Sequence, residues 1–198
     1  RGIVRGEARG FVTESGRITW LDTTAGIISA DSFVLAAGIQ SRTLADSAGI
    51  YLPLYPLKGY SLTAPIRATD RAPEVSVTDF ERKVLYARIG DKLRVAAMVD
   101  MVGEDTTITA QRIAGLTRQV RATMPHAADY DHIETWAGLR PATPNSAPIV
   151  GATKYPNLWL NVGHGPLGFT FACGTASILA DLMSGKPAPI AMDGLALK

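Results

Sequence analysis

The sequence NLWLNVGHGPLG, at residues 157–168, carries the strongest local pattern in the chain. It predicts an apolar strand over 158–162, a glycine-rich turn, and an apolar helix from Phe169 to Met183. The turn has the G-x-G-x-x-G spacing of a dinucleotide-binding loop, in which glycines let a pyrophosphate approach a helix N-terminus. That interpretation also requires a second parallel strand and an acidic residue about 20 positions further on. Only a short Pro-containing tail follows the helix, so we expect its N-terminus to face another electron-rich group.

The composition is that of a globular protein with a substantial core. Of the 198 residues, 46% are hydrophobic and 19% are charged, and the formal net charge is +2, which is too small to indicate a nucleic-acid partner. The single cysteine, Cys173, excludes an internal disulfide and is expected to be a small buried hydrophobe. The apolar run 169–183 contains Asp181 and falls short of the ~18–20 residues of a membrane span. The chain opens at Arg1 inside a predicted strand, which indicates part of a longer protein.

The first part of the chain reads as a β-meander followed by one buried strand. Short strands are predicted over 8–13, 18–22 and 27–28, with turns between them. The run DSFVLAAG, at 31–38, is continuously apolar, as in strands that are buried on both faces. It ends at Ala37-Gly38, where small residues let a backbone or cofactor come close. A short helix over 41–48 then ends at Gly49.

The middle part reads as an antiparallel sheet with a covering helix. The segment 53–59, PLYPLKG, has the composition of a linker. A helix is expected from Thr109 to Met124, because apolar residues recur at three- and four-residue steps. The strands are predicted at 60–64, 75–79, 83–89 and 92–99. The segment 134–151 leads back to the final strand, and the fold class is α/β with α+β character.

Four stretches together resemble the FAD-dependent D-amino-acid oxidase superfamily, most closely the bacterial D-amino-acid dehydrogenases. They are FVLAAG (33–38), YPLKGYSLT (55–63), WAGLRPATP (136–144) and GHGPLG (163–168). The last two are the specific ones. The resemblance covers the C-terminal portion of the family's sequence, without the N-terminal βαβ unit that binds the FAD pyrophosphate.

The resemblance implies the domain organisation. Residues 1–52 and 135–198 would belong to an FAD-binding domain, and 53–134 would form an inserted antiparallel-sheet domain that covers the flavin and binds substrate. It also implies a cytoplasmic enzyme, peripheral at the inner membrane, that passes electrons to an acceptor such as a quinone.

Arg140 is the main candidate for substrate binding. It lies in an apolar, turn-rich segment, where an unpaired guanidinium is costly to bury. In the family, the arginine at this motif position holds the substrate carboxylate, and a planar guanidinium suits that task. From the residues alone, a structural ion pair with one of the acidic side chains is the alternative.

The resemblance also implies which residues lie near FAD. In the family, the loop and helix N-terminus at 163–169 face the pyrimidine edge of the flavin, where the helix dipole favours the reduced anion. The expected cofactor-binding residues are Ala37, Gly38, Lys58, Gly138, Gly163, Gly165, Leu167, Gly168 and Phe169.

Other candidates have equally plain structural interpretations. His164 is a candidate catalytic residue, or a hydrogen-bonded loop histidine. Tyr60 and Tyr86 are candidates to line the substrate cavity, or are aromatics of the sheet. Turn chemistry alone also explains Lys58. The segment 126–132 contains two histidines and two aspartates, but their spacing is that of a solvated loop rather than a metal site.

The implied activity is oxidative deamination of D-amino acids to 2-oxo acids and ammonia, by hydride transfer to FAD. Within the same fold, a glycine- or sarcosine-type amine oxidase is the alternative, and oxygen reactivity separates the two. A different class of function is also open, in which this chain acts only with a missing N-terminal segment or a partner chain. A large exposed apolar face would favour that hypothesis.

Overall fold

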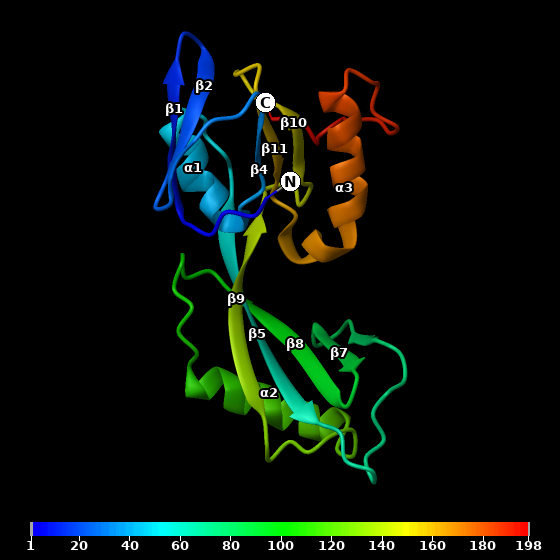
Figure 1. The fold of residues 1–198 in the computed structure, drawn as a ribbon. Helices are drawn as coiled ribbons and strands as arrows, with labels where there is room; N and C mark the ends of the chain where they lie inside the picture. The colour runs from blue at the N-terminus through cyan, green and yellow to red at the C-terminus, as the bar shows by residue number, and fades with distance from the viewer. Residues whose placement is uncertain (1, 198) are drawn as a thin grey trace. The chain divides into compact units, whose positions relative to one another are not determined.

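The computed structural model describes residues 2–197, which form two compact units (Figure 1). The first unit contains the chain up to Tyr55 and from Arg140 onward, and the second contains Pro56–Leu139. The chain passes from one to the other inside two strands, β5 (Tyr55–Pro65) and β9 (Glu134–Ala142). The sequence predicts that the middle domain begins at residue 53 and ends at residue 134. Both positions precede the points where the chain passes between the units, because β5 and β9 each run from one unit into the other.

The first unit contains two three-stranded sheets. One is the antiparallel meander β1-β2-β3 that the sequence predicts, and the other has the strand order β10-β11-β4. The strands are β1 (Ala8–Glu14), β2 (Arg17–Thr23), β3 (Gly26–Ile28), β4 (Phe33–Leu35), β10 (Ile149–Ala152) and β11 (Leu158–Val162). The helical segments are η1 (Gly38–Gln40), α1 (Ser41–Ser47), η2 (Gly165–Leu167) and α3 (Gly168–Met183).

Strands β4 and β11 are parallel, although they lie far apart in the sequence. Tyr155, in the segment that leads into β11, lies 122 positions after Phe33 of β4. Leu35 lies opposite Leu160, so the two strands end at the same edge of the sheet. Gly38 follows one strand and Gly163 follows the other. Ligands of α/β sheets bind at the carboxyl ends of parallel strands, so this edge is the natural place for a site.

The sheet that contains β4 has one buried face in this region. Phe33 and Leu35 are buried, and the Phe33 ring meets that of Phe11 edge-on at a centroid distance of 5.8 Å. Val34 points to the other face and is 47% exposed. The expectation that this strand is buried on both faces is therefore wrong for the described part of the chain. The continuous apolar run is covered on its Phe33 side only.

Helix α3 packs against β10 and β11 with a narrow apolar face. Ile178 and Leu179 join Val150 in a buried cluster, and Trp159 packs against it. Much of the remaining helix surface is exposed, including Phe171 and Cys173. The prediction that Cys173 is buried is wrong, because it lies on the uncovered side of the helix.

With η2 included, Gly165–Met183 is a 19-residue helix that is long and apolar enough to cross a membrane by length and composition. The apolar segment expected from the sequence began at Phe169 and was therefore shorter than this helix. The core helix of a soluble protein meets the same criterion, so length and composition by themselves assign no membrane span.

Asn157 ties β11 to the meander. Its side-chain oxygen accepts a hydrogen bond from the Ile18 amide at 3.0 Å, and its side-chain nitrogen donates to the Ile18 carbonyl at 2.8 Å. Asn157 is almost wholly buried, so these two bonds satisfy a backbone position that would otherwise lack partners.

The second unit is a five-stranded sheet with helix α2 across one face (Figure 1). The strand order is β6-β7-β8-β5-β9, and the pairs β6–β7, β7–β8 and β5–β8 are antiparallel. Its further elements are β6 (Val77–Asp79), β7 (Val84–Ile89), β8 (Lys92–Asp100) and α2 (Ala110–Thr123). Leu116 and Val120 of α2 pack on alternate residues of the strands, among them Leu62 and Val95. The predicted antiparallel sheet with a covering helix is present.

Two segments differ from their predicted conformation. Residues 55–59, expected to be a linker, are the first part of strand β5, and residues 134–142 form strand β9. Proline fixes φ near the extended range and lacks only a donor, so the proline-rich composition of 53–59 is compatible with a strand.

Candidate functional site

The edge of the sheet formed by β4 and β11 brings two of the sequence motifs together in the first unit. Gly163, at the start of the GHGPLG loop, has a φ of +78°. A Cβ atom on Gly163 would lie 2.6 Å from Cγ2 of Thr143 and 3.1 Å from Cδ2 of Leu54. Thr143 belongs to the WAGLRPATP motif, and its hydroxyl donates to the Ala147 carbonyl at 2.7 Å. Glycine is therefore required here for both conformation and space.

The other two loop glycines of this edge face open space. Gly38 has a φ of +60° and Gly165 a φ of +54°, and a Cβ atom at either position would meet nothing within 4 Å. Two residues before Gly163, the side-chain oxygen of Asn161 is buried without a hydrogen-bond partner among the described residues. Ala37 borders a cavity of about 300 Å³ that Phe33, Val34 and Leu44 also line. Accessible glycine backbone and an unsatisfied acceptor fit a group that approaches this edge closely.

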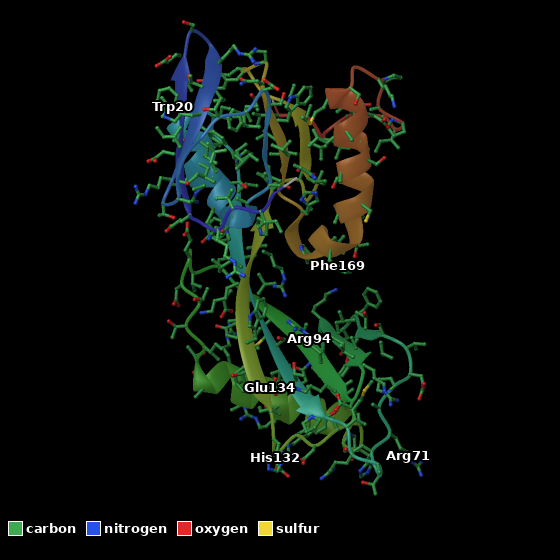
Figure 2. The ribbon with its side chains drawn as sticks, in the orientation of Figure 1. Trp20, Arg71, Arg94, His132, Glu134 and Phe169 are labelled. Carbon is green, nitrogen blue, oxygen red and sulfur yellow. The ribbon has the colours of Figure 1, made fainter. Side chains whose placement is uncertain are left out.

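Helix α3 begins at this loop without a side-chain cap. Because η2 leads directly into α3 as one helix from Gly165, the positive end of the helix dipole lies at this loop. Phe169, in the first turn, is fully exposed and is labelled in Figure 2. Leu167 differs from its neighbours, because its amide donates to the His164 carbonyl at 3.1 Å. The 3-10 turn uses that donor, and the expected contact of Leu167 with FAD stays a prediction.

His164 is partly buried and is held by the helix that follows it. Its Nε2 lies 3.2 Å from the hydroxyl of Thr175, which also donates to the Phe171 carbonyl at 3.1 Å. Because that hydroxyl proton is used, the Nε2-protonated tautomer of His164 suits this arrangement. Burial lowers the pKa of His164, which favours the neutral imidazole. These contacts agree with the alternative that His164 is a hydrogen-bonded loop histidine, and a catalytic role of His164 stays a prediction.

Arg140 lies in the half of β9 that belongs to the first unit, and its side chain is partly buried. Burial lowers the pKa of the guanidinium, because the charged form loses hydration there. Arginine remains charged in any case, so this position supplies a fixed cation in a poorly hydrated environment. Such an environment strengthens a bidentate contact with a carboxylate.

Lys58 is buried within the second unit, where its ammonium group has partners of its own. Its Nζ donates to Asp105 at 3.2 Å and to the Thr107 carbonyl at 2.5 Å, and it lies 5.3 Å from the centre of the Tyr60 ring. Burial by itself lowers the pKa of Lys58, but the bonds to Tyr60 and Asp105 outweigh it, so the pKa is raised. Lys58 thus fastens the segment between β8 and α2, and its expected role near FAD stays a prediction.

Tyr60 and Tyr86 both lie on the face of the second-unit sheet that α2 covers. Tyr60 is 2% exposed, and its hydroxyl donates to Asp100 at 2.9 Å; Arg112 also binds Asp100. Tyr86 is completely buried among Val84, Val95 and other core residues. These are the positions of core aromatics, which is the alternative raised from the sequence, and a role of either side chain in the substrate cavity stays a prediction.

Side chains of the polar loop at 126–132 contact one another and an arginine of helix α2. Asp129 binds His132 at 2.9 Å, and Asp131 binds Arg121 at 2.6 Å. Within residues 2–197, no group of three or more His, Cys, Asp or Glu side chains is arranged to hold a metal ion.

Three positions that the sequence analysis did not single out shape these sites. Asn157 joins two strands, Asp105 binds Lys58, and Thr143 fixes Gly163. Asn157 is the first residue of the motif NLWLNVGHGPLG, but its hydrogen-bond partner Ile18 lies 139 positions away in the sequence. No local pattern in the sequence predicts a contact over that distance.

The comparisons with known proteins agree with this architecture. The family model "FAD dependent oxidoreductase", abbreviated DAO, matches residues 2–182. A D-amino acid dehydrogenase 2 from Pseudomonas aeruginosa is 50% identical over 185 residues, covering 93% of this chain and 44% of the relative. A D-amino acid dehydrogenase from Paramagnetospirillum magneticum is 46% identical over 187 residues, covering 94% of this chain and 44% of the relative. The chain thus spans less than half the length of these curated relatives.

Solved structures share the fold at lower identity. Glycine oxidase from Geobacillus kaustophilus superposes with a TM-score of 0.85 at 23% identity, covering 98% of this chain and 52% of that protein. Iminodiacetate oxidase from Chelativorans sp. BNC1 gives a TM-score of 0.84 at 24% identity, covering 94% and 51%. With a family model that spans most of its length, the chain belongs to the DAO family of FAD-dependent oxidoreductases.

Proposed function

We propose that the protein containing this chain is an FAD-dependent D-amino acid dehydrogenase. The observation that carries the proposal is the 50% identity with a D-amino acid dehydrogenase over 93% of the chain. The relatives are more than twice as long, so the activity belongs to the whole protein, and this chain contributes one part of it.

The residues at the edge of the β4–β11 sheet fit FAD. Gly38 and Gly165 leave space beside their backbone, and the helix formed by η2 and α3 directs its positive dipole end to this loop. We assign Gly38, Gly163–Gly165, Gly168 and Phe169 to the surface that holds the flavin. When bound, FAD supplies the two-electron acceptor for oxidation at the carbon that bears the amine.

Arg140 binds the substrate carboxylate in this proposal. A guanidinium that has lost hydration pairs strongly with a carboxylate and fixes its orientation through two parallel hydrogen bonds. With the carboxylate held, the substrate reacts as the neutral amine, so no side chain of this chain is needed as a general base. The imino acid product takes up water and gives a 2-oxo acid and ammonia. The electrons then pass to an external acceptor such as a quinone.

A glycine- or sarcosine-type amine oxidase is the second candidate, because glycine oxidase shares the fold with a TM-score of 0.85. The two activities differ in the acceptor of electrons. A dehydrogenase reduces a quinone analogue much faster than oxygen, whereas an oxidase produces hydrogen peroxide at each turnover.

The test is an anaerobic titration of the full-length protein with bound FAD. D-alanine, L-alanine, glycine and sarcosine are added in turn, while the flavin absorption band is followed. We expect bleaching with D-alanine, little with L-alanine, and loss of bleaching in Arg140→Met. A flavin reduced faster by glycine or sarcosine than by D-alanine would overturn the dehydrogenase in favour of the second candidate.

A further inference from the structure

The turn between β9 and β10, residues 143–147, is closed by its own polar groups. The Ser146 amide donates to the Thr143 carbonyl at 3.2 Å, and the Thr143 hydroxyl donates to the Ala147 carbonyl at 2.7 Å. The side-chain oxygen of Asn145 accepts from the Ala147 amide at 3.2 Å, a bond that asparagine commonly makes two residues along the chain. Ser146 has a φ of +59°, which a serine keeps only where its surroundings hold it. These contacts give the β9–β10 turn one defined conformation.

On one side, the β9–β10 turn supports the glycine loop at residues 163–168, which we call the flavin loop. A Cβ atom on Gly163 would meet Cγ2 of Thr143 at 2.6 Å and the backbone nitrogen of Ile149 at 3.8 Å. Thr143 precedes the closed part of the turn and Ile149 follows it, so the Gly163 backbone lies against both ends. Thr143 is 7% exposed, which leaves its methyl group little room to move aside. Any displacement of the turn therefore changes the space available to Gly163.

On the other side, Asn145 joins the turn to the residues that follow α3. Figure 1 shows these residues, in red, crossing from α3 toward β10, and we call 184–197 the post-helix segment. The side-chain nitrogen of Asn145 donates to the Gly194 carbonyl at 3.3 Å, and the Val150 amide donates to the Leu195 carbonyl at 2.7 Å. Met192 anchors the segment by packing against the buried cluster that contains Val150.

The turn and the post-helix segment are incompletely packed against each other. A cavity of about 320 Å³ borders both, and its walls include Thr143, Pro144 and Asn145 from the turn and Gly194 and Ala196 from the segment. Beside this space the two segments lack dispersion contacts, so the two hydrogen bonds carry most of the attachment. The bond from Asn145 is exposed to solvent, where water competes for both partners. The link is therefore specific but readily opened.

We propose that Asn145 is a positioning residue for the flavin loop. It couples the post-helix segment to the β9–β10 turn, and the turn then holds Gly163 in the conformation that receives FAD. The inference rests on the proposed function, which assigns this loop to the flavin surface. Because the positive end of the helix dipole lies at the loop, a displaced loop also stabilises a negatively charged flavin less.

Two substitutions separate the two bonds of the Asn145 side chain. Asn145→Ala removes both, whereas Asn145→Asp keeps an acceptor for the Ala147 amide and loses the donor to Gly194. We expect both variants to accelerate amide hydrogen exchange at residues 163–168. We also expect both to raise the dissociation constant of FAD by about fivefold, the loss that corresponds to one hydrogen bond of average strength. The reduction potential of the bound flavin should shift to a lower value in both.

The experiment uses the full-length protein with saturating FAD. Exchange is measured by mass spectrometry on peptides that contain 163–168, FAD binding by flavin fluorescence, and the potential by equilibration with reference dyes. Asn157→Ala is the matched control, because it removes another asparagine side chain of the same unit, bonded to two backbone groups of Ile18 at the start of β11. It should lower stability without accelerating exchange in the flavin loop.

The outcomes separate the inference from the function on which it rests. If both Asn145 variants exchange as slowly as the parent at 163–168, the coupling is refuted while the dehydrogenase proposal stands. If Asn145→Asp matches the parent and Asn145→Ala does not, the turn alone positions the loop, and the link to the post-helix segment is refuted. If exchange rises but FAD affinity and potential do not change, the loop does not hold the flavin; that part of the proposed function has then failed, and the inference fails with it.

Discussion

Gly163 and Gly165 lie two residues apart in one loop, and replacing each by alanine gives different predicted costs. Both have positive φ, which costs a non-glycine residue about 1–2 kcal/mol. At 165 nothing lies within 4 Å of the added Cβ, so this is the whole cost. At 163 the Cβ would lie 2.6 Å from Thr143 Cγ2, and overpacking adds about 1–3 kcal/mol. Gly163→Ala should therefore destabilise the protein by about 2–5 kcal/mol, and Gly165→Ala by about 1–2 kcal/mol.

Urea unfolding of the full-length protein, followed by tryptophan fluorescence, measures this difference. Flavin fluorescence in the same titration reports release of FAD. Because Gly165 borders open space at the proposed flavin surface, we expect Gly165→Ala to release flavin at a urea concentration well below the one that unfolds it. Equal destabilisation by the two substitutions would refute the packing of Gly163 on Thr143. Unchanged flavin release in Gly165→Ala would refute the assignment of the loop to the flavin.

Three further predictions concern stability and ionisation. Asn157→Ala removes both buried hydrogen bonds to Ile18 and should cost about 2–4 kcal/mol in urea unfolding. Asn157→Asp places a buried carboxylate oxygen against the Ile18 carbonyl, so it should cost at least as much, and a smaller cost would contradict the paired geometry. Hydrogen bonds from Thr107, and then Lys58, lower the pKa of Asp105 from 3.8 to about 2. The stability lost in Asp105→Asn should therefore be constant above about pH 4 and vanish as the pH falls toward 2, and a difference that persists at pH 2 would contradict the ion pair. Burial lowers the pKa of His164 below 6.5, so its NMR titration should show protonation only at lower pH, with stability falling as the pH drops below 6.5. A His164 pKa above 6.5 would contradict the buried neutral ring.

Local patterns predicted the elements of this fold well. The meander, helices α1, α2 and α3, and strand β11 all follow from periodicity, turns and caps within about 15 residues. Strands β5 and β9 begin inside the segments that the composition had marked as connections, residues 53–59 and the stretch from residue 134 onward. Composition identifies proline and glycine, but pairing with a distant strand decides whether such a segment is extended.

Burial and partners were predicted less well, because they depend on contacts over long separations. Cys173 and Val34 are apolar positions that proved exposed. Tyr60 and Tyr86 are buried, and Tyr86 belongs to the core that contains Leu116 and Val120 of α2. An alternating strand pattern shows which residues share a face, but not which face a helix covers. The loop 163–168 was singled out correctly as a special turn. The side chain that leaves no room for a Cβ atom at Gly163, Thr143, belongs to another motif of the sequence.

The most direct test of the central claim compares D-alanine with D-alanine methyl ester, which lacks the carboxylate charge, in the parent protein and in Arg140→Met. The rate constant for anaerobic flavin reduction per molar substrate is measured for all four combinations. If Arg140 binds the carboxylate, the parent should prefer the acid over the ester by about 100-fold or more, and Arg140→Met should lose most of that preference. A preference of the same size in both proteins would show that another group holds the carboxylate, and would contradict the account of Arg140.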